Sequence, residues 1–123
     1  MRMMSCSVTF KQFDIVKVPF PFTDKASGKK RPAVIISSDQ TFNNHLDRSI
    51  MAMITSSKHK PWPLDFVIEE PEDAGLPKTS LIRMKIFTID NNLVIRKIGK
   101  LNKKDAENLK NSISLLFKTD AFH

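Results

Sequence analysis

The sequence of 123 residues has little of several residue types on which common kinds of function depend. Cys6 is the only cysteine, which excludes an internal disulfide framework. The three histidines, His45, His59 and His123, lie far apart, and none belongs to a ligand motif with a cysteine or carboxylate at fixed spacing. We therefore expect no bound metal and no other cofactor.

Glycine occurs only three times, and long apolar runs are absent. Gly28 stands alone in its loop, so the sequence has neither a phosphate-cradling loop nor the GxSxG elbow of a serine hydrolase. No apolar run approaches the roughly 20 residues of a membrane helix, and residues 1–8 lack the apolar segment of a signal peptide. We expect a cytoplasmic protein that does not associate with a membrane.

Positive charge is what the sequence has in excess. Twenty Lys and Arg against thirteen Asp and Glu give a formal net charge of +7, and the 41% of hydrophobic residues is typical of a folded protein. The length suits a single domain over residues 1–123, with residues 1–12 as a loose N-terminal extension. The charge favours nucleic acid as a partner, although a solvated basic surface would explain it equally well.

Residue patterns in the first half of the chain predict three strands. β-branched and aromatic residues indicate a strand over 13–20, and the polar, lysine-containing segment 23–30 is expected to form a flexible basic loop. Arg31 then opens a second strand, and a third begins at Ser49. Residues 50–54 of this third strand are too apolar for one small barrel to cover on both faces, which favours a second copy of the chain.

Further patterns predict a helical turn, a fourth strand and a hairpin. Asp39 is the expected N-cap of a short helical turn that precedes the third strand. Alternation of apolar and polar residues indicates a strand over 64–70. Two further strands, 79–90 and 93–99, are expected to pair as a hairpin across a tight turn at the Asn-Asn pair 91–92.

The last part of the sequence predicts a helix over 103–117, capped by Asn102. Five or six short strands with one terminal helix indicate a fold that is mainly β with helices (α+β), an antiparallel barrel or sheet on which the helix packs. The apolar side chains expected on the packed face of the helix are Ala106, Leu109, Ile113, Leu116 and Phe117.

Two other features have ordinary structural explanations. The acidic stretch 69–73, which contains Pro71, is typical of a solvated turn and does not resemble a pair of catalytic carboxylates. Trp62 lies between two prolines. We interpret it as a packing plug at a barrel edge in preference to a stacking surface for a nucleobase.

A cation and a hydroxyl remain as candidates for chemistry: Arg31 at the start of one strand and Thr55 at the end of another. RNA carries its own nucleophile, the 2′-OH, so a protein that aligns it and neutralises the phosphate needs no metal. A guanidinium forks onto two phosphate oxygens, and a threonine hydroxyl donates a further hydrogen bond. Because arginine stays protonated, we assign Arg31 to charge stabilisation before proton transfer. The alternative interpretation is that Arg31 is an ordinary surface residue and Thr55 an ordinary hydroxyl at a strand edge, with no function in either case.

The sequence resembles the MazF/PemK family of toxin-antitoxin ribonucleases from residue 13 to residue 117. FDIVKVPFPFTD resembles the family's first strand and the start of its substrate loop, GKKRPAVIIS the loop end and second strand, and IMAMITSS the third strand. The resemblance implies an SH3-like β-barrel of the CcdB/MazF/PemK type with a C-terminal helix. It assigns the catalytic arginine to Arg31 and the catalytic hydroxyl to Thr55. The residues that it places at the substrate are Thr23, Asp24, Lys29, Lys30, Ser56, Ser57 and Lys85.

The resemblance also implies a function and partners. It implies a homodimer that cleaves single-stranded RNA at selected sequences, leaving a 2′,3′-cyclic phosphate and a 5′-OH, and an acidic antitoxin that covers the groove and allows DNA binding by the complex. Lys85 replaces the family's base-contacting glutamine and Phe87 its arginine, which alters recognition more than chemistry. The alternatives are a non-enzymatic toxin of this fold that binds a protein such as DNA gyrase, and an SH3-like module that binds nucleic acid without cutting it.

Overall fold

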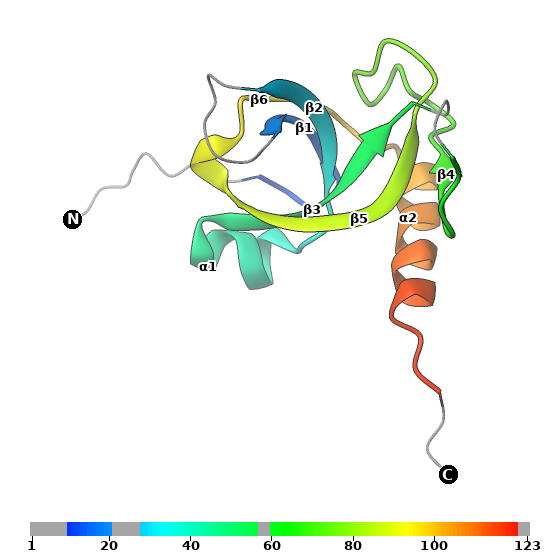
Figure 1. The fold of residues 1–123 in the computed structure, drawn as a ribbon. Coiled ribbons are helices and arrows are strands. Elements are labelled where there is room, and N and C mark those ends of the chain that lie inside the picture. The colour runs from blue at the N-terminus through cyan, green and yellow to red at the C-terminus, as the bar shows by residue number, and fades with distance from the viewer. Residues whose placement is uncertain (1–9, 21–27, 57–59, 121–123) are drawn as a thin grey trace, which may run out of the picture.

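The computed structural model describes residues 10–20, 28–56 and 60–120, which form a strongly curved sheet with a helix at its side (Figure 1). Within these residues no helix is long and apolar enough to cross a membrane. The elements in chain order are β1 (Asp14–Phe20), β2 (Lys29–Ile35), a π-helical turn (Asp39–Asn43), α1 (Asn44–Leu46), β3 (Arg48–Thr55), β4 (Phe66–Val67), β5 (Leu81–Asp90), a 3₁₀ turn (Asn91–Leu93), β6 (Arg96–Lys100) and α2 (Lys103–Leu116).

The six strands form one antiparallel sheet in the order β4-β5-β3-β2-β1-β6, so the expected mainly β fold with a C-terminal helix is confirmed. The expected hairpin is wrong, because β6 pairs with β1 and not with β5. Asn91 explains the difference. Its buried side chain accepts a 2.7 Å hydrogen bond from Ser49 Oγ, and its N–H donates to the Asp47 carbonyl at 2.9 Å. The chain is thus tied to β3 and leaves β5 in a 3₁₀ turn.

Both faces of the central strands are buried within the single chain. The first core lies on one face and includes Val34 and Ile54, whereas the second core lies on the other and includes Ile35 and Met51. Because side chains alternate along a strand, each central strand contributes to both cores. The apolar character of β3 is therefore satisfied without a second copy of the chain, and it gives no reason to expect a dimer.

Helix α2 packs on the sheet from its N-terminal turn as far as Ile113, and its last turn is exposed. Asn102 caps it as expected, since its side chain accepts the N–H of Asp105 at 2.8 Å. Ala106 and Leu109 are buried in the first core. Leu116 and Phe117 are 38% and 66% exposed, so the prediction of one continuous packed face is wrong for the last turn.

Several predicted boundaries differ from the structure. The second strand begins at Lys29, so the end of the expected basic loop belongs to β2. The strand expected over 64–70 is limited to β4. The helical turn is capped by Ser38 and not by Asp39, because the Ser38 side chain accepts the N–H of Thr41. Phe10, placed in the N-terminal extension, is buried in the second core.

The segment that follows Ala74 crosses β6 in close backbone contact. A Cβ atom on Gly75 would lie 1.8 Å from the carbonyl oxygen of Ile98, and one on Gly99 would lie 2.3 Å from that of Ala74. Gly75 also has a φ of 74°, a conformation that glycine adopts without strain. The absence of both side chains allows the crossing, which places Leu76 in the first core beside β6.

Candidate functional site

Arg31 and Thr55 lie at the ends of two neighbouring strands. The β2–β3 pairing ends where Ala33 is opposite Met53, and Arg31 and Thr55 each lie two residues beyond this last pair, on the same face as Ala33 and Met53. Residues opposite each other project from the same face of a sheet. Arg31 is exposed and Thr55 is half-buried. The two residues singled out in the sequence thus project from one face, just beyond the end of the β2–β3 pairing, and line the same hollows.

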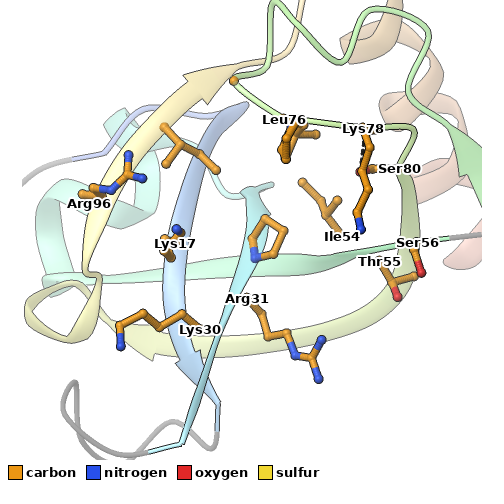
Figure 2. Close-up of a pocket in the computed structure, with 14 residues that line it drawn as sticks. Lys17, Lys30, Arg31, Ile54, Thr55, Ser56, Leu76, Lys78, Ser80 and Arg96 are labelled. Atoms are coloured by element: carbon orange, nitrogen blue, oxygen red, sulfur yellow. Dashed lines mark hydrogen bonds between the residues drawn. The ribbon is translucent and has the colours of Figure 1, made fainter.

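Two hollows meet at this pair. The large hollow has a volume of about 570 Å³ and the small hollow about 250 Å³, and Arg31, Ile54 and Thr55 line both. The large hollow is further lined by Lys17, Lys30, Pro32, Ser56, Gly75, Leu76, Pro77, Lys78, Ser80, Arg96 and Ile98 (Figure 2). The small hollow is further lined by Phe20, Met53, Arg83 and Lys85.

The large hollow is cationic. Five of its lining residues carry a positive charge, and none is Asp or Glu. In the described part of the chain no carboxylate forms a salt bridge with any of these five. Figure 2 shows Arg96, Lys17 and Lys30 at one side and Thr55, Ser56 and Lys78 at the other. A surface of this kind attracts a polyanion and presents hydrogen-bond donors to it.

The predicted substrate-binding residues are placed differently from one another. Lys30 and Ser56 line the large hollow and Lys85 lines the small one. Lys29 is exposed but lines neither. The remaining three, Thr23, Asp24 and Ser57, lie outside the described residues.

Arg83 is a residue of the small hollow that the sequence reasoning missed. Its Nε and Nη2 donate to the two carboxylate oxygens of Asp65 at 3.2 and 2.8 Å, and Nη2 also donates to the Lys60 carbonyl at 3.1 Å. The guanidinium lies over the Trp62 ring, 5.1 Å from its centroid. A positive charge within an alternating apolar strand was the available signal. Arg83 is thus fixed on three sides at the wall of the hollow.

The contacts of Arg83 change the protonation of its partner. Its hydrogen bond lowers the pKa of Asp65, an effect that burial opposes and the Trp62 N–H, which donates to the carboxylate, supports. The same hydrogen bond from the other side raises the pKa of Arg83. Trp62 is 44% exposed and does not plug the core, so the expectation of a packing residue is wrong.

Lys85 reaches the small hollow because the register of β5 shifts. Ala52 pairs with Ile86 and Met53 with Arg83, which leaves Lys85 in the irregular part of the strand. Its ammonium group lies over the Phe20 ring, 5.3 Å from the centroid. Both cations contributed by β5 are therefore held against aromatic rings. Within the described residues no group of three His, Cys, Asp or Glu side chains is placed to hold a metal ion.

Comparison with known families identifies the fold and the class of protein. Residues 11–117 match the model of the PemK-like, MazF-like toxin of type II toxin-antitoxin systems, which is most of the chain. The chain belongs to this toxin family. No curated protein matches the sequence. The matched region contains all of the described residues that line the two hollows.

Solved structures of family members share the fold at low sequence identity. The Mycobacterium tuberculosis toxin MazF-mt6 has a TM-score of 0.68 at 21% identity, covering 88% of this chain and 99% of its own. The structure of MazE-MazF from Deinococcus radiodurans has a TM-score of 0.68 at 13% identity, and the match covers 92% of this chain and 99% of that one. A mycobacterial endoribonuclease in complex with its cognate antitoxin has a TM-score of 0.69 at 13% identity, and the match covers 93% of this chain and 98% of that one. The curved sheet is thus retained over nearly the whole length of these proteins.

Proposed function

We propose that this toxin is an endoribonuclease that cleaves single-stranded RNA without a metal ion. The observation that carries the proposal is that Arg31 and Thr55 both line the two cation-lined hollows, at the place where these hollows meet. A chain of phosphates that passes from one hollow to the other lies against a guanidinium and a hydroxyl at this point. The similarity to a structure described as an endoribonuclease supports the same activity.

The two side chains suit the charge that develops during cleavage. The 2′-oxygen forms a bond to phosphorus as its proton is released, the bond from phosphorus to the 5′-oxygen breaks, and that oxygen takes up a proton. The products are a 2′,3′-cyclic phosphate and a 5′-OH. Arg31 binds the phosphate oxygens through paired N–H groups, and Thr55 donates a hydrogen bond to the same charge. These donors are in place before the reaction because both residues continue paired strands.

The test is the chemistry of the RNA ends. Purified protein is incubated in EDTA with a long single-stranded transcript, and the ends are identified by enzymatic phosphorylation of 5′-OH groups and by mass measurement of the cyclic phosphate. We expect both ends in EDTA and a strongly reduced yield of both with Arg31→Ala. Cleavage that stops in EDTA would contradict the metal-independent mechanism.

The same assay separates the other candidate functions. RNA that binds without being cut would indicate a nucleic-acid-binding module. Neither binding nor cleavage, together with binding to DNA gyrase, would indicate a toxin that acts on a protein target. Arg31 and Thr55 favour the nuclease over both, since neither alternative needs a cation and a hydroxyl at one point.

We also propose that the chain forms a homodimer and binds an acidic antitoxin. Structures of MazE-MazF and of an endoribonuclease with its cognate antitoxin support the antitoxin partner. Sedimentation should give twice the 14.1 kDa of one chain. An acidic antitoxin segment should compete with RNA for the large hollow, because both are polyanions. A complex in which both occupy the hollow with unchanged affinity would contradict competition.

A further inference from the structure

The large hollow holds a pair of cations that the cleavage step does not use. Lys17 on β1 is directly opposite Arg96 on β6, and Pro32 on β2 is directly opposite Lys17. Residues directly opposite each other in antiparallel strands project from one face, with Cβ atoms about 4.5–5.5 Å apart. Both cations line the hollow and lie on the same side of it (Figure 2).

This pair is unfavourable for the fold by itself. Like charges directly opposite each other destabilise a sheet. In the described part of the chain no carboxylate forms a salt bridge with either residue, whereas Lys97, next to Arg96, is paired with Asp14 at 3.2 Å. Lys30 lines the same side of the hollow and adds a third charge. An anion bound between these side chains would remove the repulsion.

We propose that Lys17 and Arg96, with Lys30 beside them, bind a second phosphate of the RNA strand whose cleaved phosphate lies at Arg31 and Thr55. The proposal rests on the proposed function. The subsite and the cleavage point belong to one continuous hollow. Arg96 on β6, Lys17 on β1 and Pro32 on β2 form a row across three strands. Since neighbouring strands are about 4.8 Å apart, this row spans roughly 10 Å.

The surface between the two phosphate positions favours a nucleotide over an acidic peptide. Pro32 continues the row from Arg96 and Lys17, and Ile54 and Leu76 line the hollow beside it. These apolar side chains form a floor on which a ribose or a base can lie. A polyanion of carboxylates needs cations along its length, whereas RNA alternates phosphates with apolar faces. Cations at the side and an apolar floor between them match that alternation.

The experiment measures binding of an RNA that cannot be cut. The probe is a ten-nucleotide 2′-fluoro RNA, which lacks the attacking hydroxyl, and its affinity is followed over a series of salt concentrations. Lys17→Gln combined with Arg96→Gln should weaken binding roughly tenfold, as expected for lost hydrogen bonds to a charged group. The slope of log affinity against log salt should fall by about 0.7, the value for one phosphate on a single strand.

A matched control removes the same charge elsewhere. Lys100 and Lys103 are exposed and line neither hollow, so Lys100→Gln combined with Lys103→Gln should leave affinity and salt slope within about twofold of the unmodified protein. The Tm of the Lys17/Arg96 variant should stay the same or rise, because a repulsive pair is lost. A fall in Tm would mean that the two cations are structural and would overturn the proposal.

Two further outcomes are decisive. Equal losses of RNA affinity in the Lys17/Arg96 variant and in the control would overturn the subsite. A Lys17/Arg96 variant that loses binding to polyglutamate but keeps its affinity for RNA would also overturn it, since the pair would then bind an acidic protein. Failure of the unmodified protein to cleave ordinary RNA would contradict the proposed ribonuclease alone. The binding measurement would still decide whether the subsite holds a phosphate.

Discussion

The two hollows differ in how their cations are held. In the large hollow Lys17, Lys30 and Arg96 have no carboxylate partner among the described residues, whereas in the small hollow Arg83 is fixed by Asp65 and Lys85 lies over an aromatic ring. Both hollows adjoin the first core, because Ile54 of that core lines both of them and Leu76 lines the large one.

The difference separates two uses of positive charge. A cation that is already paired with a carboxylate interacts less strongly with an anionic ligand, so its main effect is on the structure of the surface around it. A cation without such a partner keeps its hydrogen-bond donors for the ligand. We therefore expect substitutions in the large hollow to change RNA binding and those around Arg83 to change stability first. Arg31 and Thr55 belong to both hollows and should matter most for catalysis.

The largest effect is expected where the hollows meet. Arg31→Ala should lower kcat about 10²- to 10³-fold, the usual loss when one preorganised donor to the transition state is removed. Circular dichroism and Tm should be unchanged because Arg31 is exposed. Lys100→Ala is the matched control, since Lys100 is an exposed strand cation that lines neither hollow. Similar losses in both variants would indicate an effect of net charge only.

Thr55 should act through its hydroxyl. Thr55→Val keeps the shape of the side chain and should lower kcat about 10- to 100-fold, in line with the loss of a hydrogen bond to a charged group. Thr55→Ser should retain most activity. Single-turnover rates with one RNA compare the two variants directly, and equal rates would exclude the hydroxyl from the reaction.

The ion pair of the small hollow should control stability. Asp65→Asn leaves Arg83 without its anion and should lower the Tm at neutral pH by several degrees. Glu107→Gln, which breaks an exposed pair with Lys110, is the control and should have almost no effect. A Tm that is equally insensitive to both substitutions would mean that Arg83 needs no anion and would end the distinction between the hollows.

The same pair predicts how stability depends on pH. The pKa of Asp65 in the folded protein lies below its ordinary value of 3.8, mainly because of the Arg83 hydrogen bond. Its contribution is therefore complete above about pH 3.8 and is lost as the pH falls through the lower folded-state value. The difference in Tm between the unmodified protein and Asp65→Asn should be largest at neutral pH and should shrink in more acidic solutions. A difference that grows on acidification would contradict this assignment.

The smallest effect is expected at Lys85. Its ammonium group lies over the Phe20 ring, and it lines the small hollow and not the large hollow that contains the Lys17–Arg96 pair. Lys85→Gln should leave the total rate of RNA cleavage nearly unchanged and shift the preferred bases next to the cut by a few-fold. Sequencing the products of a randomised RNA pool measures this shift.

Much of the fold could be predicted because strand and helix patterns are local. The strand β5 and the cap at Asn102 were visible in the sequence and are present in the structure, although burial along β5 does not alternate, because its register against β3 shifts. The hairpin was not correctly predicted, since the Asn-Asn pair is typical of a tight turn. Hydrogen bonds that join Asn91 to Ser49 and Asp47, residues far from it in the chain, fix the path instead.

The site was predictable only in part. Arg31 and Thr55 were identified through the family resemblance, and their proximity depends on the β2–β3 register that the sequence does not specify. Lys17 and Arg96 were missed because each appears as an ordinary strand cation until β6 is paired with β1. Cross-strand neighbours of this kind follow from topology, and a wrong hairpin conceals them.

The burial of β2 and β3 on both faces has a consequence for motion. Backbone amides of Val34, Ile35 and Met51 lie between two cores, so their exchange with solvent deuterium should require global unfolding. Arg31 and Thr55 stand only a few residues beyond these slowest amides. Their main chains are therefore held by the slowest-exchanging part of the molecule, while their side chains line the two hollows. Under the proposed function, a strand of RNA that reaches this point would meet donors whose backbone needs no ordering, so little entropy would be lost there when the complex forms.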